Sequence, residues 1–472
     1  MAILSVVAIW LVLLAVSYLL GRKTNRIPRY HGKARFNLLS DALEFVTDPI
    51  EVIRKATEKC GNIFSLQILI VYTVWLRGNT LNKFYLHTRE DVWSFVGGMG
   101  IFLNKIIDAG YWNHYKVLLA SVSRYINRAA AQEYANIVTL EETHKEAAHW
   151  EAEGDIKLFE SMSGMVHKII VRSLMGEDFY QHNAEELLQL LHAMEADIGS
   201  PWCFIFPDWV PHPPAKRLQK ARDRVKEIFY ERLSERANIE KSKSRKLEDY
   251  IAFTMEDKLT APLKDLMPSH HTLLLFAAHT STAAGIAWNI ITLLRHPETM
   301  KKVTDELRSN PDTDDSLLLQ ACIKETSRRY CGMKLLRLAR ENVKLPDTEY
   351  NIPKGSVVSI SPYLTHHDPN NFPNPDEWLP ERWINEEDNK IRHVDNSNGV
   401  QYMPFGAGSH RCVGEKLAVI MVFRSLITLL REYDIEWADP EIPQTTDFEN
   451  LNFDKVGSPW LRGDVKVRIR KI

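Results

Sequence analysis

The sequence FGAGSHRCVG at Phe405–Gly414 places one cysteine in a glycine-rich segment, directly before the apolar, helix-forming stretch Glu415–Tyr433. A thiol at that position faces the backbone N–H groups that a helix start leaves without partners, and the positive end of the helix dipole. Both effects lower the pKa of a cysteine and favour the thiolate form that binds metals. Cys412 is therefore the candidate axial metal ligand.

The composition is that of a large globular protein. The chain has 472 residues, of which 45% are hydrophobic, 10% aromatic and 25% charged. We find no linker-like, low-complexity or repeated tract, which favours one large domain, and a net charge of −2 gives no indication of nucleic-acid binding. The five cysteines are odd in number and scattered, which argues against a secreted disulfide framework. Four are expected to be core or half-buried thiols: Cys60, Cys203, Cys322 and Cys331.

The N-terminus predicts a membrane anchor. Ala2–Leu20 carries no charge and is about as long as a helix needs to cross a ~30 Å hydrocarbon core. The basic residues that follow predict that the rest of the chain lies on the cytoplasmic side. A cleaved signal peptide is the alternative, but the segment has no charged start and no clear cleavage site. The expected divisions are an anchor at 1–21, a linker at 22–35 and a catalytic domain at 36–472.

Helical patterns dominate the sequence, and strand patterns are confined to short stretches. A helical repeat at Pro49–Lys59 precedes two runs of β-forming residues, Ile63–Ile70 and Thr73–Leu76, and the tail at Val465–Ile469 alternates as a strand does. Residues 130–250 show helical periodicity interrupted by prolines, and the basic residues from Lys216 to Lys246 are expected to form solvated helix faces. These patterns predict a mainly α fold with a small β-rich part, an α+β protein.

Two aromatic segments each allow two interpretations. Trp93–Phe102 mixes glycines with large apolar residues. The segment is either a loop that shapes an apolar pocket or a packed surface loop. A second group of aromatic residues either packs in the core, which is favoured, or forms a membrane-contacting or substrate-entry surface. Its members are Trp202, Phe204, Phe206 and Trp209.

Ser269–Arg295 predicts one long helix that is apolar nearly all round. Such a helix is either buried in a protein or spans a membrane. Because polar residues such as His271, His279 and Asn289 are costly in lipid, a central helix of the globule is favoured. Taken alone, a histidine on an apolar helix is more often a hydrogen-bonded core residue than a functional one.

Three weaker patterns carry charged residues. Glu325 and Arg328 share one face of a helix that Asp314 and Ser316 can cap, and an isolated surface pair of this kind contributes only ~0–1 kcal/mol. The sequence PERW follows at Pro380–Trp383. Trp112 and Lys116 form a W-x-x-x-K pattern, for which a solvated basic face is the alternative, and Arg337 lies between these segments.

Taken in order, these motifs resemble those of cytochrome P450s over essentially the whole chain. Phe405–Gly414 resembles the haem-binding loop, with histidine where many members carry arginine. Glu325–Arg328 resembles the E-x-x-R motif, Pro380–Trp383 the P-E-R-[F/W] motif, and Phe276–Ser281 the [A/G]-G-x-[D/E]-T-[T/S] segment. In the last segment histidine replaces the acid, and the resulting H-T-S is the pattern of the sterol 14α-demethylase branch.

The resemblance implies a P450 fold behind a transmembrane anchor and a role for each motif residue. Haem b would be ligated by the Cys412 thiolate, which favours O–O cleavage. Thr280 would hydrogen-bond dioxygen and His279 would relay protons. Residues implied in holding the cofactor are Lys116, Arg337, Phe405, His410, Cys412 and Gly414. The pair Glu325 and Arg328 would meet Arg382 in a structural triad behind the haem.

The resemblance implies a monooxygenase that oxidises a lipophilic small molecule. Electrons would come from NADPH–cytochrome P450 reductase or cytochrome b5, because the chain shows no flavin or dinucleotide fingerprint. The reductase would dock near Cys412 at a group of basic residues: Lys116, Arg124, Lys416 and Arg424. The enzyme would be a single-pass protein of the endoplasmic reticulum membrane with its catalytic domain on the cytoplasmic face.

We expect the substrate to be a fungal secondary metabolite such as a terpenoid, steroid or polyketide. Sterol 14α-demethylation is the second reading, although Trp93–Phe102 lacks the tyrosine and the P-x-F-G sequence of that branch. A third reading is an isomerase or dehydratase that works without a reductase, which Thr280 argues against. A fourth is a haem-binding sensor or carrier without turnover.

Overall fold

The computed structural model describes residues 27–31, 44–45, 48–68, 71–200, 202–203, 210–242, 249–311, 315–332, 334–385, 387–439, 451–452 and 458–472, with side chains of 237–242 excepted. The predicted anchor at 1–21 lies outside these residues. Within the predicted linker, Ile27 and Tyr30 are buried, and Arg29 forms a parallel bridge to Ser65. The chain therefore already packs onto the domain at Ile27.

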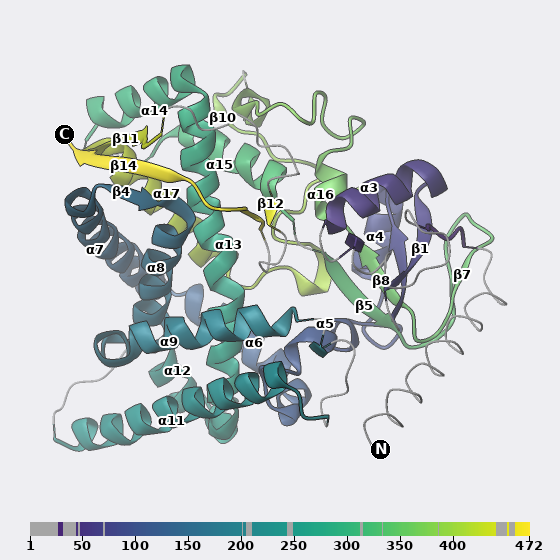
Figure 1. Ribbon diagram of the computed structural model, residues 1–472, viewed down its shortest axis with the longest axis horizontal. Helices are drawn as coiled ribbons and strands as arrows, with labels where there is room; N and C mark the ends of the chain where they lie inside the picture. Colours follow the sequence, from purple (N-terminus) through teal and green to yellow (C-terminus); the bar gives the residue numbers. More distant parts are fainter. Residues whose placement is uncertain are drawn as a thin grey trace.

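The described residues are mostly helical and the strands are short, as predicted for a mainly α fold (Figure 1). The α-helices are α3 (Pro49–Cys60), α4 (Asn79–His87), α5 (Phe95–Leu103), α6 (Tyr115–Ile126), α7 (Ala129–Glu153), α8 (Leu158–Ile170), α9 (Glu177–Ile198), α11 (Pro213–Ser242), α12 (Tyr250–Glu256), α13 (Met267–Arg295), α14 (Pro297–Ser309), α15 (Leu317–Tyr330), α16 (Pro362–His366) and α17 (Glu415–Glu432). Shorter helical turns are η1 (Ala109–Asn113), η2 (Val171–Met175), η3 (Ala261–Leu266), η4 (Pro380–Trp383) and η5 (Gly408–His410).

The largest sheet of the described residues lies at one side of the molecule (Figure 1). It has the order β1 (Ile63–Ile68), β2 (Val71–Leu76), β8 (Val357–Ile360), β5 (Leu335–Ala339) and β3 (Trp93–Ser94). A second sheet joins β11 (Tyr433–Trp437), β14 (Lys466–Lys471) and β4 (Asp155–Lys157). Two-stranded pairs are formed by β6 (Val343–Lys344) with β7 (Asn351–Ile352), β9 (Ile384–Asn385) with β10 (Lys390–Ile391), and β12 (Leu451–Asn452) with β13 (Trp460–Leu461).

The larger sheet unites segments that are far apart in the sequence. The hairpin of β1 and β2 pairs Ile63 with Leu76, and β2 runs parallel to β8 with Val74 opposite Val358. Both of these valines are fully buried. The predicted strand patterns therefore identified the first strands, whereas their pairing with the C-terminal half of the chain is a property of the tertiary structure.

Helix α13 runs through the centre of the helical part (Figure 1). Together with η3 it is long and apolar enough to span a membrane, but 78% of its most apolar window is buried inside the protein. It packs against α8, α15 and α17. The prediction of a central helix is confirmed, because the helices packed against it bury most of its apolar surface.

The prediction of a loop at Trp93–Phe102 is wrong. The segment forms β3, paired with β5, followed by α5. The helix begins there because the Ser94 hydroxyl accepts the backbone N–H of Gly97 at 2.9 Å, while the carboxylate of Glu90 accepts that of Phe95 at 2.9 Å. These caps satisfy N–H groups that a helix start leaves without partners.

The glycines of α5 serve close packing onto the sheet. A Cβ atom added at Gly98 would lie 2.5 Å from the carbonyl oxygen of Leu336, and one added at Gly97 would lie 2.8 Å from the Leu338 side chain. This contact between α5 and β5 outweighs the low helix propensity of glycine. The helical state therefore depends on tertiary contacts that the local sequence does not reveal.

Three other expectations have mixed outcomes. The four remaining cysteines are buried or half-buried, as expected. Trp202 is 51% exposed, so core packing is wrong for that residue, and Phe204, Phe206 and Trp209 lie outside the described residues. The basic helix α11 was expected to be solvated, but Arg236 is buried because it pairs with Asp178 and Asp249.

Candidate functional site

The cysteine loop adopts a backbone conformation that requires glycine. Gly406 and Gly408 both have a φ of +69°, and a Cβ atom at Gly408 would lie 2.6 Å from the Leu86 carbonyl oxygen. The Cys412 backbone N–H donates to the Phe405 carbonyl at 2.9 Å, which closes the loop just before α17. Cys412 is exposed, so its sulfur is accessible to a ligand.

The pKa of Cys412 differs from the sequence-based expectation. Protein atoms around the sulfur desolvate the thiol and raise its pKa, which outweighs the backbone N–H groups of Gly414 and Glu415, which lower it. The expectation that the helix start alone would lower this pKa is therefore wrong. A bound metal ion would supply positive charge that favours the thiolate at this position.

The middle of α13 opens at one point. Ala277 is exposed and Ala278 and Ser281 are half-buried, although this helix is otherwise buried. His279 and Thr280 lie between them and are fully buried. Small side chains therefore form the accessible face of α13, and the two predicted catalytic residues are held next to it inside the protein.

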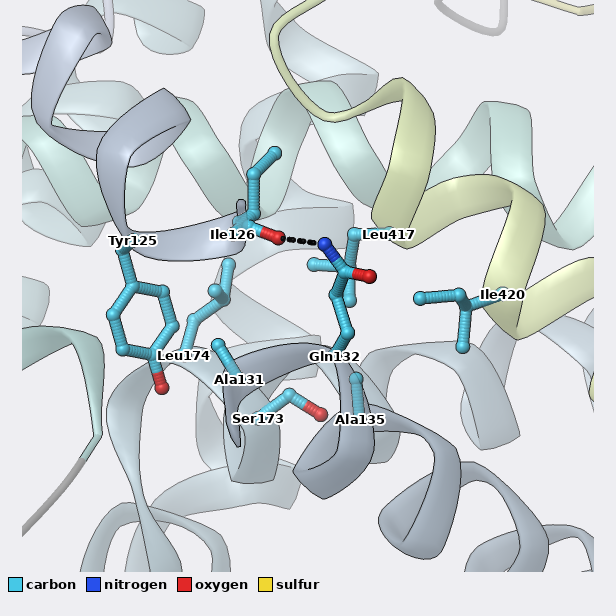
Figure 2. A pocket seen from close by; sticks show the side chains of 9 residues that line it. All are labelled: Tyr125, Ile126, Ala131, Gln132, Ala135, Ser173, Leu174, Leu417 and Ile420. Carbon is cyan, nitrogen blue, oxygen red and sulfur yellow. Dashed lines mark hydrogen bonds between the residues drawn. The ribbon is translucent and has the colours of Figure 1, made fainter. Parts of the chain in front are cut away.

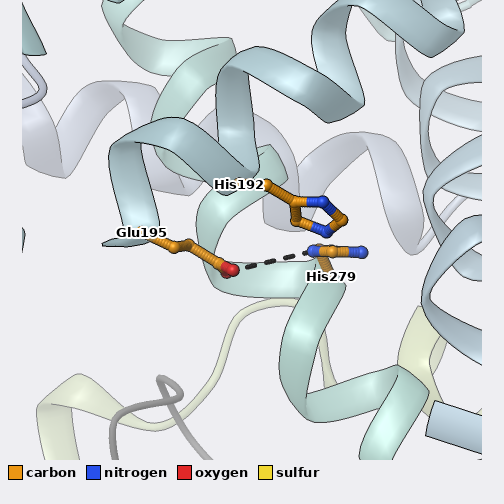
Figure 3. A group of neighbouring side chains, drawn as sticks. All are labelled: His192, Glu195 and His279. Atoms are coloured by element: carbon orange, nitrogen blue, oxygen red, sulfur yellow. Dashed lines mark ion pairs between the residues drawn. The ribbon is translucent and has the colours of Figure 1, made fainter. Parts of the chain in front are cut away.

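A carboxylate that the sequence did not reveal joins the two predicted catalytic residues. The Thr280 hydroxyl donates to Oε1 of Glu195 on α9 at 2.5 Å, and Nδ1 of His279 lies 4.0 Å from the same oxygen (Figure 3). On its other side, Nε2 of His279 lies 2.7 Å from the Ser163 hydroxyl and 3.1 Å from the Ser163 carbonyl oxygen. Because a carbonyl only accepts, Nε2 carries a proton.

The predicted triad is present and fully buried at its centre. Arg328 donates to both carboxylate oxygens of Glu325 at 2.9 Å, and Arg382 donates to Oε1 at 3.1 Å. The Glu325 carboxylate also accepts the Trp383 indole N–H at 2.8 Å and the Leu379 backbone N–H at 3.0 Å. Five donor groups thus compensate the cost of burying this charge.

A buried histidine connects the triad to the cysteine loop. Arg328 donates to the His366 carbonyl at 2.7 Å, and Nδ1 of His366 lies 3.1 Å from the Arg328 carbonyl. The Met403 backbone N–H donates to Nε2 of His366 at 2.9 Å, two residues before Phe405. His366 belongs to no motif, so its position becomes visible only when the segments fold together.

The aromatic and basic residues of the W-x-x-x-K pattern lie near the start of α6. Lys116 is exposed, with its ammonium group 6.0 Å from the ring centre of Tyr115. Trp112 is half-buried, and its indole N–H donates to Oδ1 of Asn104 at 2.5 Å. Lys116 is thus available to an anionic group, and its contact with a cofactor stays a prediction.

Arg337 is buried and caps the C-terminal end of α4. Its guanidinium donates to the carbonyl oxygens of Tyr85 at 2.6 Å, Thr88 at 3.0 Å and Leu86 at 3.3 Å. A cation at this end also interacts favourably with the helix dipole. This structural role comes in addition to the cofactor contact predicted for Arg337, which stays a prediction.

His410 is held by a carboxylate and an aromatic ring. Its Nε2 lies 3.1 Å from Oε2 of Glu90, and its ring stacks on Phe95 with ring centres 4.4 Å apart. Burial raises the pKa of Glu90, but hydrogen bonds from His410, Phe95, Ser94 and Val96 outweigh it and lower the pKa to about 2. The propionate contact predicted for His410 stays a prediction.

A recess lies on the side of α17 (Figure 2). Leu417 and Ile420 of α17 form one wall. The opposite wall includes Gln132, whose amide donates to the Ile126 carbonyl at 2.9 Å. The recess contains no candidate catalytic residue, so we assign it no chemistry.

The residues present fit a haem group ligated by cysteine. Cys412 offers an accessible sulfur, and the exposed Ala277 on α13 offers space without a bulky side chain. The positive-φ glycines keep the cysteine loop close to α4, and the buried triad supports the same loop through His366.

Comparison with known proteins agrees with this site. A family model described as Cytochrome P450 matches residues 34–459. The chain is 45% identical over 432 residues to "Cytochrome P450 monooxygenase pyvB" of Aspergillus violaceofuscus, covering 92% of this chain and 88% of the relative. It is also 45% identical over 442 residues to "Cytochrome P450 monooxygenase pynD" of Aspergillus niger, covering 92% and 91%.

Sterol demethylases are more distant relatives. "Lanosterol 14-alpha demethylase" of Homo sapiens is 27% identical over 428 residues, covering 86% of this chain and 81% of the relative. The resemblance to that branch is thus real but weaker than the similarity to the fungal monooxygenases. The chain belongs to the cytochrome P450 family and is a haem-thiolate monooxygenase whose haem iron is bound by a cysteine.

Proposed function

We propose that this P450 oxidises a lipophilic secondary metabolite of a fungus, with Cys412 as the iron ligand and Thr280, Glu195 and His279 as the proton-transfer residues. The observation that carries the proposal is the buried hydrogen bond between Thr280 and Glu195 beside the accessible face of α13. A hydroxyl that is hydrogen-bonded to a buried carboxylate can release its proton when the carboxylate supplies another in its place. When bound, the haem supplies dioxygen activation.

The proton path runs through side chains of two helices. Nδ1 of His279 and the Thr280 hydroxyl approach the same oxygen of Glu195, so a proton that His279 takes up at Nδ1 can pass to the carboxylate. Glu195 can then protonate the Thr280 oxygen as Thr280 releases its own hydroxyl proton. Ser163 holds the far nitrogen of the imidazole ring and so fixes its orientation. This arrangement favours a monooxygenase over an isomerase or dehydratase, which requires no proton delivery to dioxygen.

The half-buried apolar side chains of α5 support a lipophilic substrate. Phe95, Val96, Met99 and Phe102 are only half-buried, although they are large and apolar. Partly exposed apolar side chains of this kind provide contact area for an apolar ligand. The fungal relatives at 45% identity favour a secondary metabolite such as a polyketide, terpenoid or steroid, whereas sterol demethylases at 25–28% identity make 14α-demethylation the second candidate.

We further propose that NADPH–cytochrome P450 reductase, or cytochrome b5, docks at the α17 side. Lys116 and Lys416 are exposed, and the apolar recess of Figure 2 with the 45%-exposed Val419 lies on the same helix as Lys416. Arg424 is half-buried, and Arg124 pairs with Asp257 at 2.7 Å. Both arginines therefore contribute less positive charge to the docking surface than the two lysines do. We expect Lys416→Glu to slow reduction by the reductase, and Lys301→Glu on α14 to leave it unchanged.

The proposed location is the endoplasmic reticulum membrane, with an anchor at 1–21, a linker at 22–35 and the catalytic domain at 36–472 on the cytoplasmic face. The uncharged run at Ala2–Leu20 and the basic residues that follow support this arrangement. Alkaline extraction of microsomes tests it: the full chain should stay in the pellet. Release of the full chain into the supernatant would contradict the anchor.

The experiment for the function is incubation of microsomes containing the protein with a library of fungal polyketides, terpenoids and sterols, with and without NADPH. We expect a product one oxygen atom heavier that forms only with NADPH. Reduced-CO spectra of wild type and Cys412→Ala provide the haem test, and only wild type should show the thiolate-type Soret band. A product that forms equally without NADPH would instead indicate an isomerase or dehydratase.

A further inference from the structure

Three metal-binding side chains converge beside the central helix (Figure 3). His192 and Glu195 are three residues apart and therefore share one face of α9, and both point toward His279 of α13. One ligand atom of each side chain lies within 4.8 Å of the other two. Glu195 and His279 are buried and His192 is half-buried, so the group is enclosed on the protein side and reachable from the surface.

The donor set indicates which ion would fit. Two imidazoles and one carboxylate, with a fourth position left open, are a common ligand set for Zn²⁺, whereas Ca²⁺ and Mg²⁺ require oxygen ligands. Tetrahedral zinc bonds bring ligand atoms to about 3.4 Å from one another. The 4.0 Å between Nδ1 of His279 and Oε1 of Glu195 is close enough to be closed by side-chain rotation. We propose that His192, Glu195 and His279 form a binding site for Zn²⁺.

The surroundings of His279 support this assignment. The Ser163 carbonyl oxygen and hydroxyl hold Nε2, so the ring presents Nδ1 toward the Glu195 carboxylate. A lone pair that faces a carboxylate oxygen is stabilised by a cation between them, and an outer hydrogen bond that fixes the second nitrogen is typical of a zinc-bound histidine. Ser163 can keep its contacts to His279 when zinc binds.

Zinc at this site would act on the proposed proton path. The ion would take Oε1 of Glu195, which is the acceptor of the Thr280 hydroxyl. With zinc on Nδ1 of His279 and on Glu195, neither group could pass a proton to Thr280, so zinc would inhibit turnover. This consequence rests on the proposed function, whereas zinc binding itself does not.

Isothermal titration of the ferric, haem-loaded protein with ZnCl₂ tests the site, without substrate or reductase. We expect one saturable zinc ion per wild-type chain. His192→Gln and Glu195→Gln should weaken binding by at least about tenfold, since loss of even an outer-sphere partner can cost that much. The matched control is His182→Gln on the same helix, because His182 is exposed and bonds only locally to the Asp178 carbonyl at 2.8 Å. It should bind zinc as wild type does.

Zinc-edge X-ray absorption of the complex should show two imidazole ligands, and reduced-CO spectra of each variant confirm that it is folded. Absence of saturable binding in wild type would overturn the proposal. Equal zinc affinity in His192→Gln and His182→Gln would do the same, because the ion would then lie elsewhere. Neither result depends on NADPH-dependent oxidation. The proposed zinc site can therefore be refuted without refuting the proposed monooxygenase function, and the reverse also holds.

Discussion

At the scale of single residues, hydrogen bonds made by unexpected partners define the site. Thr280 was predicted to act in oxygen chemistry, but the group that orients its hydroxyl is Glu195, 85 residues away in the chain. His366 likewise joins the buried triad to the cysteine loop through the Met403 N–H. Both partners are buried, so loss of either leaves a polar group that water cannot easily satisfy.

The hydroxyl of Thr280 can be tested directly. Thr280→Ala removes the donor to Glu195, so protons should reach dioxygen less efficiently. We expect the ratio of oxidised product to NADPH consumed to fall by at least about tenfold. A general acid typically contributes about 10²- to 10⁴-fold, so a tenfold loss is the minimum expected. The ratio is measured with reconstituted enzyme and reductase.

A second threonine of α13 provides the control for this measurement. Thr272 is also buried, and its hydroxyl donates to the Pro268 carbonyl at 2.8 Å, away from Glu195. Thr272→Ala should therefore leave the product ratio unchanged. If both variants gave the same ratio, the proposed role of Thr280 would be wrong.

At the scale of elements, close contact between α5 and β5 fixes the helix against the small sheet. The glycines of α5 let its backbone approach that of β5, and a Cβ atom at Gly98 would meet the backbone of Leu336 and Arg337 at 2.5–2.7 Å. Backbone atoms cannot rotate away as a flexible side chain can. The position of α5 thus depends on the absence of a side-chain methyl group at Gly98.

Substitution of Gly98 should push α5 away from β5. We expect Gly98→Ala to lower the free energy of unfolding by about 1–3 kcal/mol through overpacking. Gly164→Ala on α8 should instead raise it by about 0.5–1 kcal/mol, because nothing lies within 4 Å of the added Cβ and alanine favours a helix. Urea denaturation measures both. Equal effects of the two substitutions would contradict the contact.

At the scale of the whole molecule, burial of histidines makes stability depend on pH. His366 and His271 are almost fully buried. Desolvation, the largest cause, lowers the pKa of His366 to about 3 and that of His271 to about 4, and nearby arginines add to the effect. The unfolded chain therefore binds more protons than the folded protein at acidic pH, so stability rises with pH between about 3 and 6.5.

Acid should accordingly destabilise the protein below about pH 6.5. The lowered pKa of His366 alone should reduce the free energy of unfolding by about 2 kcal/mol between pH 7 and pH 5. Urea denaturation at both pH values measures the loss. In His366→Gln the pH-dependent loss should be smaller by about that amount, while His149→Gln, whose side chain is 72% exposed, should behave as wild type. The same pH-dependent loss in all three proteins would refute this origin.

Much of this molecule follows from local sequence. Apolar patterns identified α3, α13, α17 and the first strands of the sheet, because burial of a periodic apolar face is a local property of the chain. Motif spacing predicted Cys412, Thr280 and the charged triad, and the structure brings Glu325, Arg328 and Arg382 together. A family resemblance added their roles, and the family itself is confirmed by comparison.

Only the tertiary structure decided the remainder. The glycine-rich segment after Trp93 became a helix because Ser94, Glu90 and the backbone of β5 stabilise it, none of which acts through local propensity. Glu195 and His192 reached His279 because α9 crosses α13. The pKa of Cys412 was raised rather than lowered because desolvation depends on all surrounding atoms. Contacts between distant segments, and the loss of water that they cause, are not encoded at any single position in the sequence.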